Sequence, residues 1–534
     1  MESKQSKALQ KKPKMSFPDR RWFFLIPIIL VFYFFLYKLT VSRVGAFGCF
    51  DDCFNYIGGY FILQGKVIYK DFFFNHQPFA AFISAITQLV ANPVNLYGFI
   101  LAHRLVLLSF GLIFNLILII RFKMAGLFFV FIYELFKPYM FGERFLAEGF
   151  IVYPLVYLIG LVWETHFGRK IYKIDVITGA ISAWFVIFMR EPFIPLSILL
   201  FTFLVYNLRK KRLAIFAFLF LFALSVVVFL LFPFTDYYFN LIEVNKITNA
   251  GSELASIFTF SGLGAILSYP WFWFWGGDIS YFRIVDSSIA FLIVIYLYSY
   301  FLYKKEIKLP LILLAVFFLS NLRPVMPGIV YYEAFHSLVR FGISIFILGL
   351  FLKYFYENLS LRKYSFIGVI FAVSIFISFF LTKDSYYHQI INSQKEFSDN
   401  YSGIYAYGEA VKRLSRPEHT FFIDGSEELM YWMSGRKSNY KYGWYTSFMP
   451  KIEKYSQERK NMLKTDAPDF YWGSCEPAVL PFEKLITDSG KYTRLYIQDK
   501  PSCLYVKKDI VRNISDRAWD DVKSLGFSQP EKRL

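Results

Sequence analysis

Long apolar runs separated by short basic links constrain this chain more than any other feature of its sequence. Of the 534 residues, 56% are apolar and 22% are aromatic, which is more than a water-soluble domain could bury. A membrane-spanning helix needs roughly 17–25 apolar residues. Runs close to that length lie at 22–40, 98–120, 124–140, 149–166, 174–189, 193–208, 213–232, 286–303, 309–322, 337–354 and 364–381. The sequence therefore predicts an α-helical polytopic membrane protein with about eleven spans.

The basic residues predict how these spans are oriented. A net charge of +18 could indicate a nucleic-acid partner, but lysines and arginines gather in the short links, for example at 121–123, 169–173 and 209–212. This distribution is typical of cytoplasmic links in a multi-pass protein, so no nucleic acid is expected. The first run follows a basic segment and has no cleavage site after it. We expect a plasma (inner) membrane protein with a cytoplasmic N-terminus, and an odd number of spans places the C-terminus outside.

The same topology divides the chain into two predicted domains. Residues 1–382 form the transmembrane domain, with a first outer loop at 41–97, and residues 383–534 form a small extracytoplasmic α/β domain. Within the outer loop, apolar residues recur at helical spacing over 53–63 and 78–90, which predicts two short interfacial helices.

Aromatic clusters and alternating stretches add finer expectations. Phe72 to Phe74 and the segment 269–275 are interpreted as contacts with the membrane and its interface. Alternating stretches at 420–424 and 502–507 predict strands in the C-terminal domain.

The four cysteines form two pairs in the sequence. Cys49 and Cys53 are four residues apart, a spacing that suits neither a zinc knuckle nor a disulfide within one helix. Cys475 and Cys503 lie in the C-terminal region expected outside the cytoplasm, where a disulfide is compatible with the compartment.

Ionisable residues concentrate in the first outer loop, where a membrane protein has little use for them unless chemistry or transport requires it. Asp51 and Asp52 follow the first span directly. A stretch with a regular pattern comes after them, and its landmarks are Gly65, Tyr69, Asp71, Phe72, Phe73, His76 and Pro78.

This loop resembles that of the polytopic GT-C glycosyltransferases, in the branch of the protein O-mannosyltransferases, the lipid A aminoarabinose transferase and their bacterial relatives. Those enzymes carry an acidic pair after the first span and a Gly…Tyr-x-Asp-Phe-Phe-x-x-His-x-Pro stretch, although their usual double proline is Gln77-Pro78 here. Arg104 matches their arginine at the outer end of the second span. Arg144 with Glu148 matches loosely their arginine and acidic residue between spans three and four.

The resemblance implies a reaction on the outer face of the membrane. A sugar would pass from a polyprenyl-phosphate donor to an acceptor hydroxyl, with inversion at the anomeric carbon. The acceptor alternatives are a glycan, a lipid or a protein.

An inverting transfer needs one base that takes the proton of the attacking hydroxyl. Asp51 is the candidate base by its position in the motif, and Asp52 would orient the acceptor, hold a cation or tune the pKa of its neighbour. Either residue could instead cap the following helix. Asp71 could bind sugar hydroxyls and His76 the donor phosphate, or both could hold the loop together through internal hydrogen bonds.

An arginine is expected to receive the leaving phosphate, because its planar guanidinium pairs with two phosphate oxygens. The candidates at outer ends of spans are Arg104, Arg144, Arg190, Arg323 and Arg340. We favour Arg104 for its match to the motif, and Arg323 because it precedes the outer loop with Glu333 and His336. The predicted substrate-binding set therefore consists of Asp71, His76, Arg104, Arg144, Glu148, Arg323, Glu333 and His336.

Metal dependence and two other functions are also considered. No metal ligand set is predicted, although Glu143 and Glu148 leave a divalent cation possible. A transporter or flippase of polyprenyl-linked glycans is the alternative function, but it should show inverted repeats and ionisable residues within both halves of the membrane, and this sequence shows neither. A plain membrane anchor would leave the first-loop motif unexplained.

Overall fold

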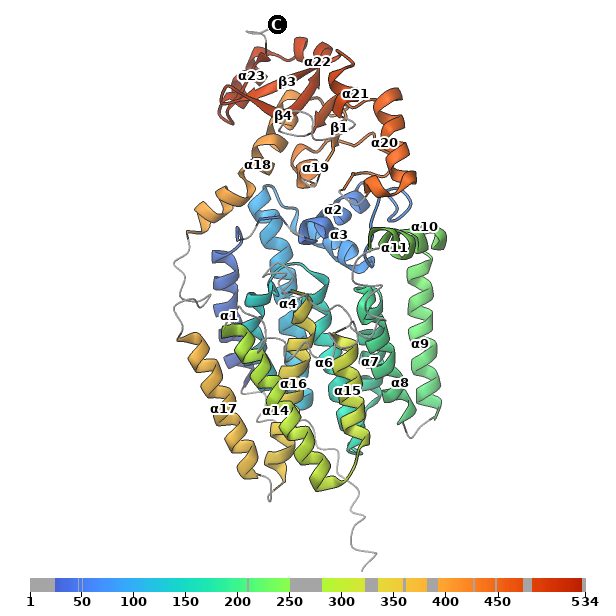
Figure 1. Ribbon diagram of the computed structural model, residues 1–534, viewed down its shortest axis with the longest axis vertical. Helices are drawn as coiled ribbons and strands as arrows, with labels where there is room; N and C mark the ends of the chain where they lie inside the picture. The colour runs from blue at the N-terminus through green and yellow to red at the C-terminus, as the bar shows by residue number, and fades with distance from the viewer. Residues whose placement is uncertain are drawn as a thin grey trace, which may run out of the picture.

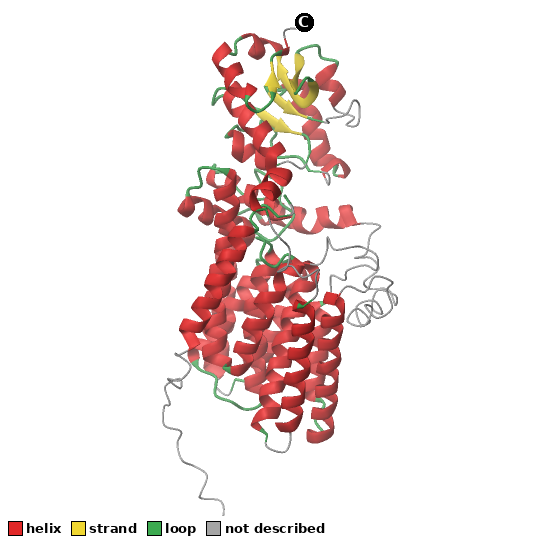
Figure 2. Ribbon diagram, turned by 90° about the vertical axis from the view of Figure 1, so that its left-hand side faces the viewer, coloured by secondary structure: helices red, strands yellow, loops and turns green. Residues whose placement is uncertain are grey.

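The computed structural model describes residues 25–46, 48–49, 51–208, 211–249, 281–321, 335–358, 362–381, 392–425, 428–446, 449–473 and 483–530. A bundle of long helices forms its lower part, and a smaller region with a β-sheet lies at one end of the bundle (Figures 1 and 2). This confirms the predicted fold class.

Each predicted span corresponds to a helix in the described part of the chain. These helices are α1 (Leu25–Ser42), α4 (Leu96–Phe122), α5 (Met124–Phe136), α6 (Ala147–His166), α7 (Lys173–Ile187), α8 (Ile194–Tyr206), α9 (Lys211–Phe229), α14 (Tyr281–Lys304), α15 (Lys308–Ser320), α16 (Leu338–Glu357) and α17 (Arg362–Phe380). Among the described residues, five helices are long and apolar enough to cross a membrane by themselves.

The buried fraction of each helix shows which helices lie at the centre of the bundle and which lie at its outside. The apolar windows of α6 and α16 are 100% buried, as expected for helices that are apolar on all sides and surrounded by other helices. The corresponding windows of α1 and α9 are only 22% and 11% buried. Their exposed leucines, isoleucines and phenylalanines form an outer surface suited to lipid.

Charged links tie the helices together at the end of the bundle far from the sheet. Glu164 of α6 pairs with Arg169 at 2.9 Å and with Lys353 of α16 at 3.6 Å. Arg121 of α4 pairs with Asp175 of α7 at 3.0 Å. These basic links therefore lie together at one end, as the positive-inside pattern predicts.

Two short helices, α2 (Asp51–Leu63) and α3 (Phe79–Ala91), cover the opposite end of the bundle, and they lie between it and the sheet region (Figure 1). They confirm the two helices predicted in the first outer loop. α10 (Phe234–Tyr238), the π-helical turn Phe239–Glu243 and α11 (Val244–Asn249) lie at the same level.

The C-terminal region contains one five-stranded sheet in the order β1-β2-β4-β3-β5. Its strands are β1 (Phe421–Ile423), β2 (Phe470–Trp472), β3 (Tyr492–Ile497), β4 (Lys500–Lys507) and β5 (Phe527–Ser528). β1 and β2 are parallel, and the other pairs are antiparallel. Its helices are α18 (Ser393–Leu414), α19 (Leu429–Ser434), α20 (Glu453–Thr465), α21 (Glu483–Thr487), α22 (Lys508–Arg512) and α23 (Asp516–Lys523). Both strands predicted from alternation are present, as β1 and β4.

The phenylalanine run of the first outer loop does not face the membrane, and that interpretation was wrong. Phe72, Phe73 and Phe74 are each fully buried. The Trp444 ring, from the C-terminal region, lies 5.6 Å from the Phe72 ring and 5.1 Å from that of Phe54, and the Phe73 amide donates to the Tyr442 carbonyl at 3.1 Å. The loop thus forms a shared core with the C-terminal region. The aromatic segment 269–275 lies outside the described residues.

Candidate functional site

The acidic doublet begins helix α2, where the partial positive charge of the helix N-terminus favours carboxylates. A disulfide joins Cys49 to Cys53 across the doublet. The four-residue spacing was predicted not to suit a disulfide within one helix. Cys49 instead precedes the helix, which starts at Asp51, and this irregular backbone brings the two Cα atoms to 5.5 Å. The disulfide restrains the backbone around Asp51 and Asp52.

The two carboxylates have different environments, and that of Asp52 is closed. Its side chain is fully buried and accepts two hydrogen bonds from Arg144, at 3.0 Å to Nε and 2.8 Å to Nη2. The Tyr56 hydroxyl donates to it at 3.2 Å. A bidentate, buried pair of this kind holds a carboxylate in one orientation.

Asp51 instead lines a small cavity of about 260 Å³. The residues that line it are Asp51, Asn55, His76, Ala80, Leu146, Ala147, Glu148, Met189 and Arg190. Among the described residues, Asp51 has no ion pair within 4.0 Å. Burial raises the pKa of this carboxyl from 3.8 to about 6, against the opposing effect of Arg190 and with a further increase from Glu148. An available carboxylate with a pKa near neutrality is suited to accept a proton.

Arg190 organises the other polar side chains of this cavity. Its Nε donates to Glu148 at 2.8 Å, and its Nη1 lies 2.7 Å from Nδ1 of His76. Burial, and then the charge of Arg190, lower the pKa of His76 well below its usual value. His76 is therefore neutral, with Nδ1 accepting from the guanidinium and the proton on Nε2. Burial disfavours the charge of Arg190, but the carboxylates around it outweigh burial and raise its pKa.

The structure thus brings Asp51, His76 and Glu148 of the predicted set together in one cavity, with Arg144 beside it through Asp52. Arg190 was considered only as one of five phosphate candidates. The available signal was its position in the Met-Arg-Glu-Pro link between two apolar runs. An arginine in such a link can point into the bundle.

Asp71 lies apart from these groups and closes the loop on itself. Its carboxylate accepts from the Val67 amide at 2.8 Å, which is the internal loop bond considered as the alternative to sugar binding. The role of His76 in the loop is different, because only its backbone carbonyl takes part, accepting from the Tyr69 hydroxyl at 2.8 Å.

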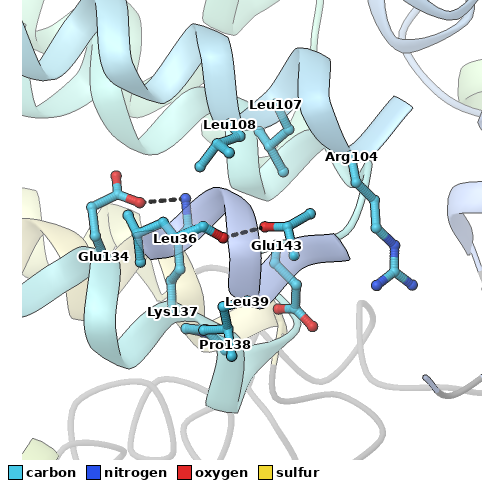
Figure 3. Close-up of a pocket in the computed structure, with 10 residues that line it drawn as sticks. Leu36, Leu39, Arg104, Leu107, Leu108, Glu134, Lys137, Pro138 and Glu143 are labelled. Carbon is cyan, nitrogen blue, oxygen red and sulfur yellow. Dashed lines mark hydrogen bonds and ion pairs between the residues drawn. The ribbon is translucent and has the colours of Figure 1, made fainter. Parts of the chain in front are cut away.

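Arg104 and Glu143 line a second cavity, of about 380 Å³, between α1, α4 and α5 (Figure 3). Arg104 donates to the Arg43 carbonyl at 2.7 Å, while its buried Nε has no partner among the described residues. Lys137, in the same wall, pairs with Glu134 at 2.5 Å. Burial raises the pKa of Glu143.

The remaining predicted residues are near the start of α16 or outside the described chain. His336 and Arg340 are buried at that start, and the adjacent Phe335 packs with Phe141 and with Leu146, which lines the Asp51 cavity. Arg323 and Glu333 lie outside the described residues, as does Cys475. Cys503 is disulfide-bonded.

The carboxylates of the site do not form a metal-binding set in the part of the chain that the structure describes. No group of three or more histidine, cysteine, aspartate or glutamate side chains is close enough there to hold an ion. Arg144 and Arg190 already neutralise Asp52 and Glu148. A divalent cation at Glu143 and Glu148 stays an alternative that the sequence left open.

Comparison with known proteins gives one likeness in overall fold. No family model matches the chain, and no curated protein matches it. Among solved structures, the chain is similar to ArnT from Cupriavidus metallidurans bound to undecaprenyl phosphate, an aminoarabinose transferase of the branch named by the sequence resemblance. The identity is 10%, the match covers 91% of this chain and 98% of that chain, and the TM-score is 0.47. A likeness of this size carries no argument about residues or activity.

Proposed function

We propose that this chain is a glycosyltransferase that moves a sugar from a polyprenyl-phosphate donor to an acceptor hydroxyl. The observation that carries the proposal is the different environment of the two adjacent carboxylates. Asp52 is held by Arg144, whereas Asp51 faces a cavity with its pKa raised to about 6. The motif that resembles the GT-C enzymes places its base at this same residue.

In this reaction the acceptor hydroxyl attacks the anomeric carbon of the donor sugar. Its proton passes to the Asp51 carboxylate, the new oxygen–carbon bond forms, and the bond from the anomeric carbon to the phosphate oxygen breaks. The polyprenyl phosphate leaves with the electron pair. His76 and Arg190 hold the wall beside Asp51, and the Arg190 charge counteracts part of the rise in its pKa.

An inverting displacement puts the base and the leaving phosphate on opposite sides of the anomeric carbon. The cation that receives the phosphate therefore does not need to touch Asp51. Arg104 remains our candidate, because its Nε is buried without a partner among the described residues and it lines the second cavity. Arg323, Glu333 and His336 remain candidates from the sequence.

The outer face of the plasma membrane is the proposed location of the site. The Cys49–Cys53 disulfide lies at the doublet, and disulfides persist in oxidising compartments. The basic ion-pair network lies at the other end of the bundle, as expected for the cytoplasmic side. Residues 383–534 form the proposed extracytoplasmic domain.

The test is transfer by the purified protein in lipid nanodiscs. Undecaprenyl-phosphate sugars labelled in the sugar would be incubated with polysaccharide, lipid and peptide acceptors in turn. Asp51→Asn should abolish transfer, whereas Asp399→Asn, a matched change at an exposed position of α18, should leave it unchanged. Full transfer by Asp51→Asn would reject the base assignment. Movement of the donor lipid across the bilayer with no bond transfer would favour the transporter.

A further inference from the structure

In the described part of the segment between α1 and the acidic doublet, the Ala46 amide donates to the Arg43 carbonyl at 3.1 Å, and the other hydrogen bonds to the backbone carbonyls of residues 43–48 come from distant side chains. The Arg43 and Ala46 carbonyls accept from Arg104 at 2.7 and 3.5 Å. The Gly45 carbonyl accepts from the Asn400 amide group at 2.8 Å. A segment without its own helix or sheet bonds keeps its conformation only if such partners hold it.

Helix α18 of the C-terminal region lies directly against this segment. A Cβ atom on Gly45 would come within 2.4 Å of the Phe397 backbone nitrogen, so only glycine permits this contact. Arg43 pairs with Glu396 one residue earlier on α18, at 3.4 Å. The backbone of α18 is therefore packed directly against the backbone around Gly45.

The Gly48 carbonyl connects α18 to the doublet. It accepts one hydrogen bond from the Tyr401 hydroxyl of α18 at 2.8 Å and another from Nη2 of Arg144. The same Nη2 donates to Asp52, and Asp51 is the residue immediately before Asp52. Tyr401 is fully buried, so water cannot replace its hydroxyl without disturbing the packing.

We propose that Tyr401 of α18 is a positioning residue for the proposed active site, and that it holds the Asp51 carboxylate in place through Gly48 and Arg144. This inference rests on the proposed function, since it concerns the geometry of the proposed base. It gives the C-terminal region a role in catalysis itself. A domain that only recognises an acceptor would not need to bond to the backbone that carries the base.

The test compares Tyr401→Phe with Tyr405→Phe in the full-length protein. Each change removes one hydroxyl from α18, but Tyr405 lies one turn further on and is 40% exposed. Hydrogen exchange of the peptide covering 43–53 reports the local effect, and initial rates with an undecaprenyl-phosphate sugar report the catalytic effect. A net hydrogen bond of ordinary strength corresponds to a change of roughly three- to tenfold.

For Tyr401→Phe we expect exchange in this peptide to rise by about three- to tenfold and kcat to fall by a similar factor. The KM for the donor should not change, because the variant misplaces the base without touching the donor. Tyr405→Phe should match the unaltered protein in all three quantities. A purely structural role of Tyr401 would lower stability throughout the C-terminal region and leave no selective effect on kcat.

Two results would overturn the proposal. Exchange in Tyr401→Phe equal to that in Tyr405→Phe would show that the hydroxyl does not hold the segment. Raised exchange with an unchanged kcat would show that the segment is held but does not position the base. In either case transfer by the unaltered protein would still support the glycosyltransferase, whereas no transfer by that protein would count against both proposals.

Discussion

Replacing the two neighbouring carboxylates by amides, one at a time, should change stability in opposite directions. Asp51 is ionised at pH 7 although burial raises its pKa from 3.8 to about 6. That difference corresponds to about 3 kcal/mol at about 1.4 kcal/mol per pH unit. Because the side chain is only partly buried, solvent screening reduces this to about 1–2 kcal/mol. Asp51→Asn removes the charge at nearly constant volume and should therefore stabilise the protein by about 1–2 kcal/mol at pH 7.

The stability gained by Asp51→Asn should decrease as the pH falls. The folded-state pKa of Asp51 lies above its unfolded value, so ionisation destabilises the fold fully above pH 6 and progressively less as the pH falls below it. The advantage of Asp51→Asn should therefore shrink between about pH 6 and 4. Asp52→Asn should do the opposite at pH 7, because it leaves the buried Arg144 without its counter-charge, at a cost of about 3–5 kcal/mol.

The measurement is the apparent midpoint of thermal unfolding in detergent micelles at one heating rate, since membrane proteins of this size generally unfold irreversibly. Asp51→Asn, Asp52→Asn and the exposed control Asp399→Asn would be compared at pH 7 and pH 5. If Asp51→Asn lowers the midpoint at pH 7, or its gain is the same at both pH values, then Asp51 is not a desolvated carboxylate and the reasoning fails.

Three further predictions concern the rate, the disulfide and the shared core. The value of kcat/KM should fall about tenfold from pH 7 to pH 5 as Asp51 takes up a proton near pH 6, and initial rates that stay flat over this range would contradict the base assignment. A reducing agent should slow transfer, because cleavage of the Cys49–Cys53 disulfide loosens the backbone around Asp51 and Asp52. The double variant Cys49→Ser/Cys53→Ser should already be slow and should not respond to the reducing agent. Any response that remains in this variant would come from the disulfide of Cys503. Trp444→Ala should destabilise the protein by about 3–5 kcal/mol, because this buried ring packs against Phe54; a thermal midpoint close to that of the unaltered protein would show that the C-terminal region does not share a core with the loop.

The sequence predicted the helical bundle well because the bilayer allows few alternatives. A segment in hydrocarbon must satisfy its own backbone hydrogen bonds, so an apolar run of sufficient length becomes a helix. The first-loop helices α2 and α3 were also predicted, since their apolar residues recur at helical spacing. These patterns are local, and each can be read from a window of about 20 residues.

Contacts between distant segments were beyond the reach of such patterns. The run Phe72 to Phe74 has the same composition whether lipid or protein covers it, and its partner Trp444 belongs to the C-terminal region. The Cys49–Cys53 disulfide depends on the residue at which α2 begins, and helix starts are among the least certain features of a sequence. The pairing of Asp52 with Arg144 likewise joins the start of α2 to a loop about 90 residues later in the sequence.

The pairing of Asp52 with Arg144 separates the proposed roles of two adjacent acids. A second unpaired carboxylate beside Asp51 would raise its pKa further by repulsion, and Asp52 does act in that direction. Arg190 opposes this effect, and Arg144 does so to a smaller extent. With both arginines in place, the pKa of Asp51 stays near 6, so the residue is mostly ionised at neutral pH and can still accept a proton readily. Arg144→Gln should therefore move the acidic limb of the rate profile to higher pH, and a limb that stays near pH 6 would show that the pair does not control the base.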